Sequence, residues 1–332
     1  MLESLIALDA IKLNFSPQSL FILNLTIAFI MFGVALELKP EHFKYLALHP
    51  KPAIVGAISQ FILMPVMTFC LAIAFRNFIT PTIGLGMILV ASCPGGNVSN
   101  FFSALARGNV ALSVSLTAIS DIGAVLITPF NFAFWGTLFT KVYALLNASD
   151  LVRPLDIPFL HVLQTIVILL GIPLTLGMIV NLNFPKFSGK ILIYIKRFSL
   201  FAFGAIILVM FLSNWEFFVK YIKYVFIIVL IHNSLALTLG YSFASIFKLS
   251  FKDRKTITIE TGIQNSGLAL ILLFNPNIFP TDLAIGGMAF IAAWWGLWHL
   301  IAGLTIGSIW SGFKLAPKLL DKNVISKELG NI

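Results

Sequence analysis

Two acidic residues, Asp121 and Glu260, stand in the middle of long apolar stretches of the chain. If these stretches cross a membrane, an ionisable side chain at that depth is costly and marks an ion or substrate pathway by default. A neutral carboxyl that ties two helices together would also explain either residue. The other eleven of the 13 acidic residues fall in polar connections, at the ends of apolar stretches or in the tails.

Polar residues cluster around Glu260 in the run TITIETGIQNSGLAL, and a second cluster, SCPGGNVSN, lies in an earlier apolar stretch. Proline removes a helical hydrogen-bond donor and glycine permits unwinding, so a helix break is predicted at Pro94, Gly95 and Gly96. Backbone at that depth is open only where it is buried in protein or lines a cavity. Unwound carbonyl groups, together with hydroxyl, amide and carboxylate oxygens, would suit a small hard cation. Sodium or a proton is therefore the expected coupling ion.

The apolar stretches are long enough to span a bilayer. Of the 332 residues, 59% are hydrophobic and 11% charged, whereas soluble domains carry about 25% charged residues. A helix of about 20 apolar residues crosses the hydrocarbon core. This pattern predicts an all-α polytopic membrane protein and excludes an ordinary soluble enzyme. Nine spans are predicted, at 20–38, 50–75, 82–107, 110–140, 159–183, 190–213, 222–247, 254–276 and 280–312.

The net charge of +9, from 22 basic and 13 acidic residues, predicts the orientation of the chain. The basic residues sit in short connections, where they act as topology signals, so no nucleic-acid partner is expected. With the N-terminus outside and the C-terminus inside, 16 of the 22 basic residues face the cytoplasm. The remaining six are Lys12, Arg76, Lys141, Arg153, Lys220 and Lys223. The N-terminal stretch lacks the basic region of a signal peptide and no transit peptide is apparent, which favours a bacterial cytoplasmic membrane. Cys70 and Cys93 lie in apolar stretches and predict neither a disulfide nor a structural zinc site.

The chain divides into two hydrophobic halves at a polar connection, of which 141–154 is predicted to be an extracellular linker. Spans two to four and seven to nine form matched triplets of opposite predicted orientation. Each triplet has a middle span interrupted by Gly, Asn and Ser. Such opposed triplets indicate an inverted-repeat secondary transporter. Residues 313–332 are predicted to be a basic cytoplasmic tail.

The polar clusters and their surroundings resemble the bile-acid:sodium symporter family, in the nine-span form of a bacterial member. The matching runs are IMFGVALELKP (30–40), HPKPAIVGAISQFILMP (49–65), CPGGNVSNFFSALARGNVALSVSLTAIS (93–120), TIETGIQNSGLA (258–269) and WHLIAG (298–303). The resemblance implies a core domain, at 46–140 and 218–312, in which two broken helices cross. It also implies a panel domain, at 1–45 and 155–215.

The resemblance further implies two sodium sites and a substrate cavity at matching positions of this chain. The first sodium site would use Ser99, Asn100, Ser113, Thr117 and Glu260. The second would use Gln60, Glu260, Thr261, Ile263 and Gln264. The substrate-binding residues would be Asn97, Asn265 and His299.

Three positions qualify this transfer. Asn97 stands where the family has a small hydroxyl residue, and Leu300 follows His299 where an Asn can occur, so the substrate does not carry over. His299 could also be a packing histidine. Asp121 stands where the family usually has an uncharged residue, one helical turn after Thr117. It is an extra ion or proton site, or a structural carboxyl.

The leading hypothesis is sodium-coupled symport of a small organic anion by alternating access, without an organic cofactor. The alternative is a proton-coupled organic-anion carrier of the same fold that uses Asp121 or Glu260. An intramembrane enzyme is a remote alternative, because the chain has neither H-E-x-x-H nor an acid in a G-x-G-D context. The partners are the substrate and the lipid bilayer, and the oligomeric state is left open. His232 and Asn233 are expected to form a polar clamp between helices.

Overall fold

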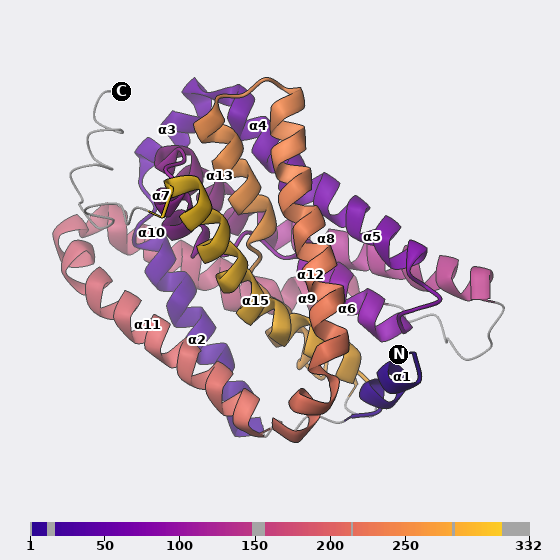
Figure 1. The fold of residues 1–332 in the computed structure, drawn as a ribbon. Helices are drawn as coiled ribbons and strands as arrows, with labels where there is room; N and C mark the ends of the chain where they lie inside the picture. Colours follow the sequence, from indigo (N-terminus) through magenta and orange to yellow (C-terminus); the bar gives the residue numbers. More distant parts are fainter. Residues whose placement is uncertain (1, 12–16, 148–156, 214, 281–282, 314–332) are drawn as a thin grey trace.

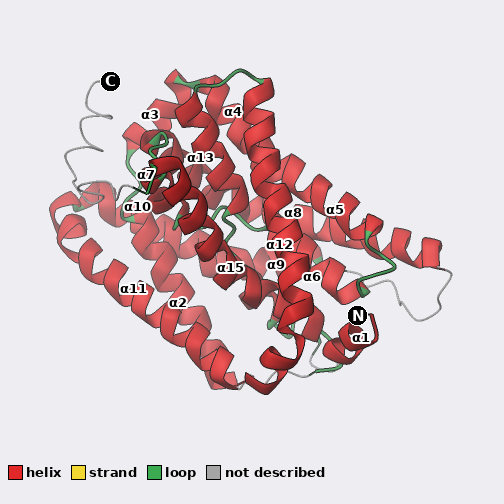
Figure 2. Cartoon of the chain, viewed as in Figure 1, coloured by secondary structure: helices red, strands yellow, loops and turns green. Residues whose placement is uncertain are grey.

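The computed structural model describes residues 2–11, 17–147, 157–213, 215–280 and 283–313. Throughout this part the chain is built from helices, with no strand (Figures 1 and 2). In chain order the helices are α1 (Leu2–Asp9), α2 (Pro17–Ala35), α3 (Pro40–Leu48), α4 (Pro50–Ile58), α5 (Met64–Ala74), α6 (Pro81–Ser92), α7 (Ser99–Leu105), α8 (Val110–Asn147), α9 (Phe159–Ile166), α10 (Ile172–Asn183), α11 (Pro185–Ser213), α12 (Trp215–Ile246), α13 (Phe251–Gly262), α14 (Ser266–Leu273) and α15 (Gly286–Ser311). Two π-helical turns, η1 (Ser59–Leu63) and η2 (Val167–Gly171), join α4 to α5 and α9 to α10.

Each predicted span falls on one helix or on one interrupted helix. Five helical rods of the described part are long and apolar enough to cross a membrane, which supports a multi-pass protein. These are Pro50–Ala74, Val110–Leu146, Phe159–Asn183, Trp215–Ile246 and Gly286–Ser311. The number of nine crossings and the orientation of the termini remain predictions.

The predicted linker at 141–154 begins too early. α8 continues to Asn147, because the run KVYALLN consists mostly of good helix formers and Tyr143 packs in the core. The rest of the linker and nearly all of the predicted basic tail at 313–332 lie outside the described residues.

The helix starts follow from proline in the first turn. Proline occupies the first position of α3, α4, α6 and α11, where its missing N–H costs no hydrogen bond. The cap of α6 is Thr80, whose hydroxyl accepts from the Ile83 backbone N–H at 3.4 Å. These local signals agree with the predicted starts of α4 and α6, whereas α12, which has no proline at its start, begins at Trp215, seven residues before the predicted span at 222–247.

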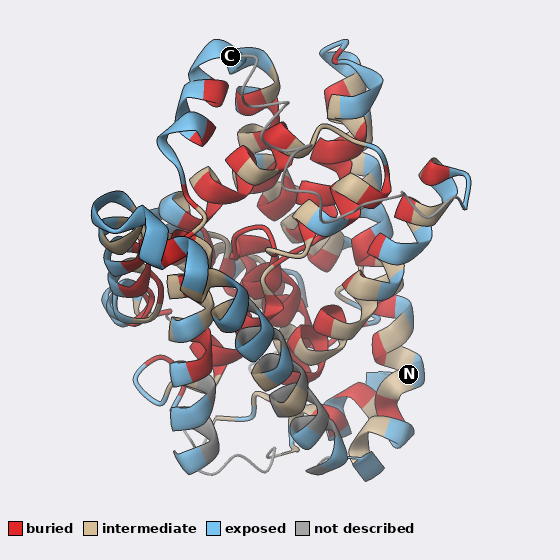
Figure 3. Cartoon of the chain, turned by 90° about the vertical axis from the view of Figure 1, so that its left-hand side faces the viewer, coloured by how far each residue is buried: buried red, intermediate tan, exposed pale blue. Residues whose placement is uncertain are grey.

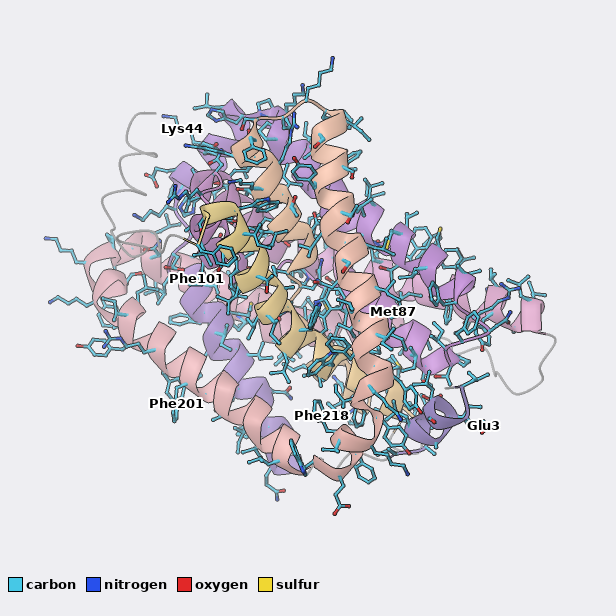
Figure 4. All side chains as sticks on the ribbon, viewed as in Figure 1. Glu3, Lys44, Met87, Phe101, Phe201 and Phe218 are labelled. Carbon is cyan, nitrogen blue, oxygen red and sulfur yellow. The ribbon has the colours of Figure 1, made fainter. Side chains whose placement is uncertain are left out.

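Three helices form one group of mutual contacts. α2, α10 and α11 contact one another, and in Figure 1 α2 and α11 run side by side along one flank. Buried residues concentrate in the interior of the bundle and exposed ones on its outer helices (Figure 3). Large apolar side chains remain on the outside, such as Phe201, which is 78% exposed and points away from α11 in Figure 4. An apolar exterior of this kind suits a lipid environment. The division into core and panel domains remains a prediction.

The short helix α1 is docked against the start of α6 and α15. The Asp9 carboxylate accepts hydrogen bonds from the Thr80 hydroxyl at 3.1 Å and from the Thr82 hydroxyl. A Cβ at Gly287 of α15 would meet the same carboxylate oxygen, so glycine is needed for this close approach. Burial raises the pKa of Asp9 to about 6, against the two hydroxyl groups, which lower it.

Candidate functional site

The centre of the bundle is formed by two interrupted helices that meet at their breaks. The chain is non-helical at 93–98, between α6 and α7, and again between α13 and α14. Gly95 and Gln264 form an isolated antiparallel bridge across the two breaks. The Gly96 N–H donates to the Ile263 carbonyl at 2.7 Å, and the Asn265 N–H donates to the Pro94 carbonyl at 2.8 Å. The backbone groups freed by each break are thus satisfied by the other, as burial in an apolar medium requires.

Glycine is required at the meeting point because the two chains approach so closely. A Cβ at Gly96 would lie 3.1 Å from the Gln264 carbonyl oxygen, and a Cβ at Gly95 would lie 3.3 Å from Glu260 Oε2. A larger residue would push the breaks apart. The Gly95 N–H donates to the Ser120 hydroxyl of α8 at 2.9 Å, which attaches the first break to a third helix.

The carboxylate of Glu260 receives hydroxyl groups from α7 and α8. Ser99 donates to Glu260 Oε1 at 2.7 Å, and Ser113 donates to the same oxygen. Thr117 Oγ1 lies 3.3 Å from Glu260 Oε2 and 3.3 Å from Asn100 Oδ1. The structure therefore brings together all five residues of the first predicted sodium site.

Oxygen acceptors outnumber protons in this cluster. The single hydroxyl proton of Thr117 faces four acceptors: the Ser113 carbonyl at 3.0 Å, Glu260 Oε2 and Asn100 Oδ1 at 3.3 Å each, and Glu260 Oε1 at 3.5 Å. Glu260 itself is 5% exposed, so water cannot easily compensate for its charge. An excess of buried oxygen lone pairs around one carboxylate is the environment that a small hard cation prefers.

Hydrogen bonds of the Gln264 side chain connect residues of the second predicted sodium site. Gln60 Nε2 donates to Gln264 Oε1 at 2.8 Å, and Gln264 Nε2 donates to the Thr261 carbonyl at 2.8 Å. Gln60 and Glu260 both line a cavity of about 10 Å³, close to the smallest volume that holds one water-sized particle. The Ile263 carbonyl, by contrast, is engaged by the N–H of the first break.

The π-helical turn η1 carries Gln60, and its neighbour Ser59 lies 2.8 Å from the Thr261 hydroxyl. An insertion of this kind changes the direction in which successive side chains point, and it is frequent at functional sites. Sequence reasoning missed Ser59, as it missed Ser120. The spacing of Ser113, Thr117 and Ser120 at intervals of four and three residues was the available signal for Ser120.

Asp121 lies on α8, fully buried, and neither carboxylate oxygen has a hydrogen-bond partner among the described residues. A buried carboxyl group without donors is expensive to keep. A carboxyl group that links two helices would accept or donate a hydrogen bond, and Asp121 does neither among the described residues. This argues against a purely structural role for Asp121.

The three predicted substrate-binding residues lie on separate elements. Asn97 falls in the first break, Asn265 is the N-cap of α14 and accepts from the Leu268 N–H at 3.1 Å, and His299 lies on α15. Asn97 Oδ1 and His299 Nδ1 are buried without a partner in the described part. Two unpartnered polar atoms are free for a ligand, although the structure joins these residues by no direct contact.

The predicted clamp at His232 and Asn233 is confirmed. Thr68 Oγ1 of α5 lies 2.7 Å from His232 Nε2, and Asn233 Nδ2 donates to the Gly262 carbonyl at 2.7 Å. The second bond holds α12 against the end of α13, next to the second break. Both side chains therefore act as links between helices, outside the oxygen cluster around Glu260.

The described residues contain no group of three or more His, Cys, Asp or Glu side chains that could hold a metal ion. The cluster at Glu260 instead consists of hydroxyl, amide and carbonyl oxygens around one carboxylate. This donor set is typical of alkali and alkaline-earth cations.

Comparison with known proteins gives a consistent picture. Residues 24–221, more than half of the chain, match the sodium bile acid symporter family. The chain is 32% identical over 304 residues to the uncharacterized sodium-dependent transporter YocS of Bacillus subtilis (strain 168), which covers 90% of this chain and 87% of that protein. It is 27% identical to the human ileal sodium/bile acid cotransporter, over 83% of this chain and 78% of the other. It is also 32% identical to the mouse P3 protein over 78% of this chain, and there it spans about half of the relative, 52%. The resemblance predicted from the two polar clusters is confirmed, and the chain belongs to the sodium bile acid symporter family.

Proposed function

We propose that this protein is a sodium-coupled symporter that carries a small organic anion across the membrane by alternating access. The observation that carries the proposal is the excess of buried oxygen acceptors around Glu260, where one hydroxyl proton of Thr117 faces four acceptors. The names of two relatives, a sodium-dependent transporter and a sodium/bile acid cotransporter, support sodium as the ion. Inward sodium and a negative membrane potential would supply the driving force.

Two sodium ions would share the Glu260 carboxylate. The first would be held by Ser99, Asn100, Ser113, Thr117 and Glu260, and the second by Gln60, Gln264, Glu260 and the backbone at Thr261 and Ile263. Each hydroxyl or amide that now bonds to its neighbour would turn toward an ion, so the ions would replace hydrogen bonds between helices. Because the ligands come from α7, α8, α13 and η1, binding would tie these elements together.

The substrate would bind beside the breaks, at Asn97, Asn265 and His299. The breaks are paired backbone to backbone, so ions that order them would also order Asn97 and Asn265. Alternating access would then move the helices around the breaks against α2, α10 and α11. The two triplets of spans would form the inverted repeats of such a mechanism.

A proton-coupled carrier is the second candidate, favoured by the buried and unpartnered carboxyl group of Asp121. A proton bound there would remove the cost of the buried charge. This candidate predicts uptake that depends on a pH gradient and continues without sodium.

The test is uptake into proteoliposomes that contain the purified protein. A thermal-shift screen of organic anions, in sodium chloride and in choline chloride, first identifies a ligand, because ligand binding stabilises the native state. Radiolabelled ligand is then offered under an inward sodium gradient, an inward proton gradient, or neither. Symport requires accumulation with the sodium gradient alone. Accumulation driven by the proton gradient in the absence of sodium would replace the proposal with the second candidate.

A further inference from the structure

An apolar groove on the outside of the bundle lies between α5, α6 and α12. Its volume is about 210 Å³. Ile79, Met87 and Ile228 form a buried floor, while Phe78 and Ile227 form a rim and are 58% and 49% exposed. Figure 4 shows Met87 beside α12. The groove shares no lining residue with the cavity beside Glu260, so it is separate from the ion cluster.

A groove with this lining holds hydrocarbon. Apolar cavities of about 150 Å³ lined by Leu, Ile and Phe stay dry and accept hydrocarbon ligands. All of the lining residues here are Leu, Ile, Phe or Met. Since the rim is exposed on the apolar exterior of a multi-pass protein, the adjacent hydrocarbon is a lipid acyl chain.

Basic side chains border this groove. Lys220 and Lys223 precede Ile227 on α12 by seven and four residues, so all three lie on the same helix face. Both lysines are exposed. The third basic residue, Arg76, lies in the turn between the lining residues Phe75 and Phe78.

The backbone of the turn that carries Arg76 is held by Tyr143. The Tyr143 hydroxyl lies 3.2 Å from the Arg76 carbonyl oxygen and 3.4 Å from the Ile79 carbonyl oxygen, which fixes the turn against α8. The Arg76 guanidinium donates once, to the Ile73 carbonyl at 3.4 Å, and its Nε has no partner among the described residues. A guanidinium with spare donors is suited to a phosphate group.

These three residues belong to the six basic residues that the topology rule leaves outside. Loop lysines and arginines normally concentrate on the cytoplasmic side, so an outward cluster needs another explanation. Arg76 adjoins the lining residue Phe75, and Lys223 lies one helical turn before the lining residue Ile227, so basic residues border the groove on two of its walls. Apolar lining and basic rim together match the two parts of an anionic phospholipid.

We propose that this groove is a binding site for an anionic phospholipid. One acyl chain lies on the floor formed by Ile79, Met87 and Ile228, and the phosphate lies between Arg76, Lys220 and Lys223. A basic residue near a membrane surface contributes roughly fivefold to the binding of an anionic lipid. The lipid would hold α12 against the turn between α5 and α6, at a site distinct from the ions and the substrate.

The test is native mass spectrometry of the full chain in detergent with dioleoyl-phosphatidylglycerol, and with dioleoyl-phosphatidylcholine as the lipid with identical chains. Wild-type protein is expected to retain phosphatidylglycerol in preference to phosphatidylcholine. Lys220→Gln with Lys223→Gln should weaken phosphatidylglycerol binding roughly 30-fold and leave phosphatidylcholine binding unchanged. Ile227→Trp should weaken the binding of both lipids, because the larger ring fills the mouth of the groove. The matched control is Lys44→Gln with Lys51→Gln, which removes two exposed charges elsewhere and should behave as wild type.

The side chains of Lys44, Lys51, Lys220, Lys223 and Ile227 are exposed and that of Arg76 is half-buried, so these variants are expected to retain the fold. Equal retention of the two lipids by wild-type protein would overturn the headgroup assignment, as would unchanged binding in the double lysine variant. Unchanged binding in Ile227→Trp would overturn the acyl-chain assignment. Glycerol phosphate that displaces phosphatidylglycerol at equal concentration would show a simple anion site and refute a lipid site. Arg76→Gln is an independent test of the proposed phosphate contact at the turn between α5 and α6. It should weaken the binding of phosphatidylglycerol and leave the binding of phosphatidylcholine unchanged.

Discussion

Glu260→Gln should weaken sodium binding roughly 100-fold and leave the fold intact. The substitution removes one charge and keeps the shape of the side chain. In the proposed arrangement that charge faces two sodium ions, whereas every other ligand is a neutral oxygen. The loss should therefore fall on ion binding and only slightly on folding.

The expected loss of sodium affinity follows from the charge. Two opposite unit charges about 4 Å apart attract by roughly 4 kcal/mol at an effective dielectric constant of about 20. Hydroxyl and amide ligands remain in the variant, so the net loss is smaller, about 3 kcal/mol, which corresponds to roughly 100-fold in affinity. Sodium half-saturation should rise by that factor.

The expected effect on stability is small because glutamine keeps a carbonyl oxygen. That oxygen can still accept from Ser99, which donates at 2.7 Å in the structure, and from Ser113. Only the contact between Oε2 and Thr117, at 3.3 Å, is exchanged for an amide group, which changes the free energy of unfolding by about 1 kcal/mol. Glu260→Ala would leave both serine hydroxyls without this acceptor, at about 1–3 kcal/mol each. The alanine variant should therefore be clearly less stable than the glutamine variant.

The assay measures apparent melting temperature against sodium concentration, with choline replacing sodium at constant ionic strength. Wild-type protein should be stabilised by sodium with a saturating profile. Glu260→Gln should have a similar melting temperature in choline and no stabilisation by sodium in the same range. Glu41→Gln, an exposed acid on α3, is the matched control and should follow the wild type. A half-saturation for Glu260→Gln within threefold of wild type would refute the placement of sodium at this carboxylate.

Four further predictions use other parts of the structure. Asp121→Asn should raise the sodium concentration for half-maximal uptake roughly tenfold if the carboxylate is ionised near the ion. Loss of the pH dependence of uptake, with unchanged sodium dependence, would assign a proton to Asp121 instead. If the sodium dependence of uptake is the same for the variant and the wild type at two pH values, only a structural role remains. Sodium and substrate should tighten each other's binding by about 1–3 kcal/mol, and calorimetric titration that gives equal substrate affinity in sodium and choline would contradict symport. Gly96→Ala should separate the paired breaks, since its Cβ would lie 3.1 Å from the Gln264 carbonyl oxygen, and it should reduce sodium-driven uptake at least tenfold. Gly189→Ala is the control and should leave uptake unchanged, because a Cβ there meets nothing within 4 Å. Burial raises the pKa of Asp9 to about 6 from its ordinary 3.8, so the state with α1 docked binds more protons than the state with α1 detached. The free energy of docking should therefore weaken as the pH rises from about 4 to 6, by at most about 3 kcal/mol. Hydrogen-exchange protection factors of α1 amides at pH 5 and 7.5 measure this change, and Asp9→Asn should remove it.

Much of the fold could be predicted because its signals are local. Apolar runs bounded by proline predicted the starts of α4 and α6 to within one residue, whereas α11 begins at Pro185, five residues before the predicted span. The break in 93–98 was visible because Pro94 and two glycines stand together in an apolar run. The end of α8 was missed, since a helix can continue into a more polar segment when one side chain, here Tyr143, is buried against the core.

Within the site, residue types pointed to Glu260 and its serine and threonine partners, but contacts across the bundle were beyond local pattern. Gln60 and Gln264 are 204 positions apart and meet only because η1 turns Gln60 toward the second break. The Ser120 hydroxyl accepts from the Gly95 N–H, and nothing in the sequence around either residue predicts this contact. That no described residue donates to Asp121 is likewise apparent only when the neighbouring helices are in place.

The composition and spacing of the chain were sufficient to establish a helical membrane protein, the position of its breaks and the chemical type of its central cluster. These properties depend on hydrophobicity, backbone freedom and side-chain oxygen atoms, all of which belong to short segments. The pairing of the breaks, the surplus of acceptors at Glu260 and the groove rimmed by Arg76 and Lys223 required the packed bundle. They depend on distances between helices far apart in the chain, and such distances are set by the simultaneous packing of all side chains.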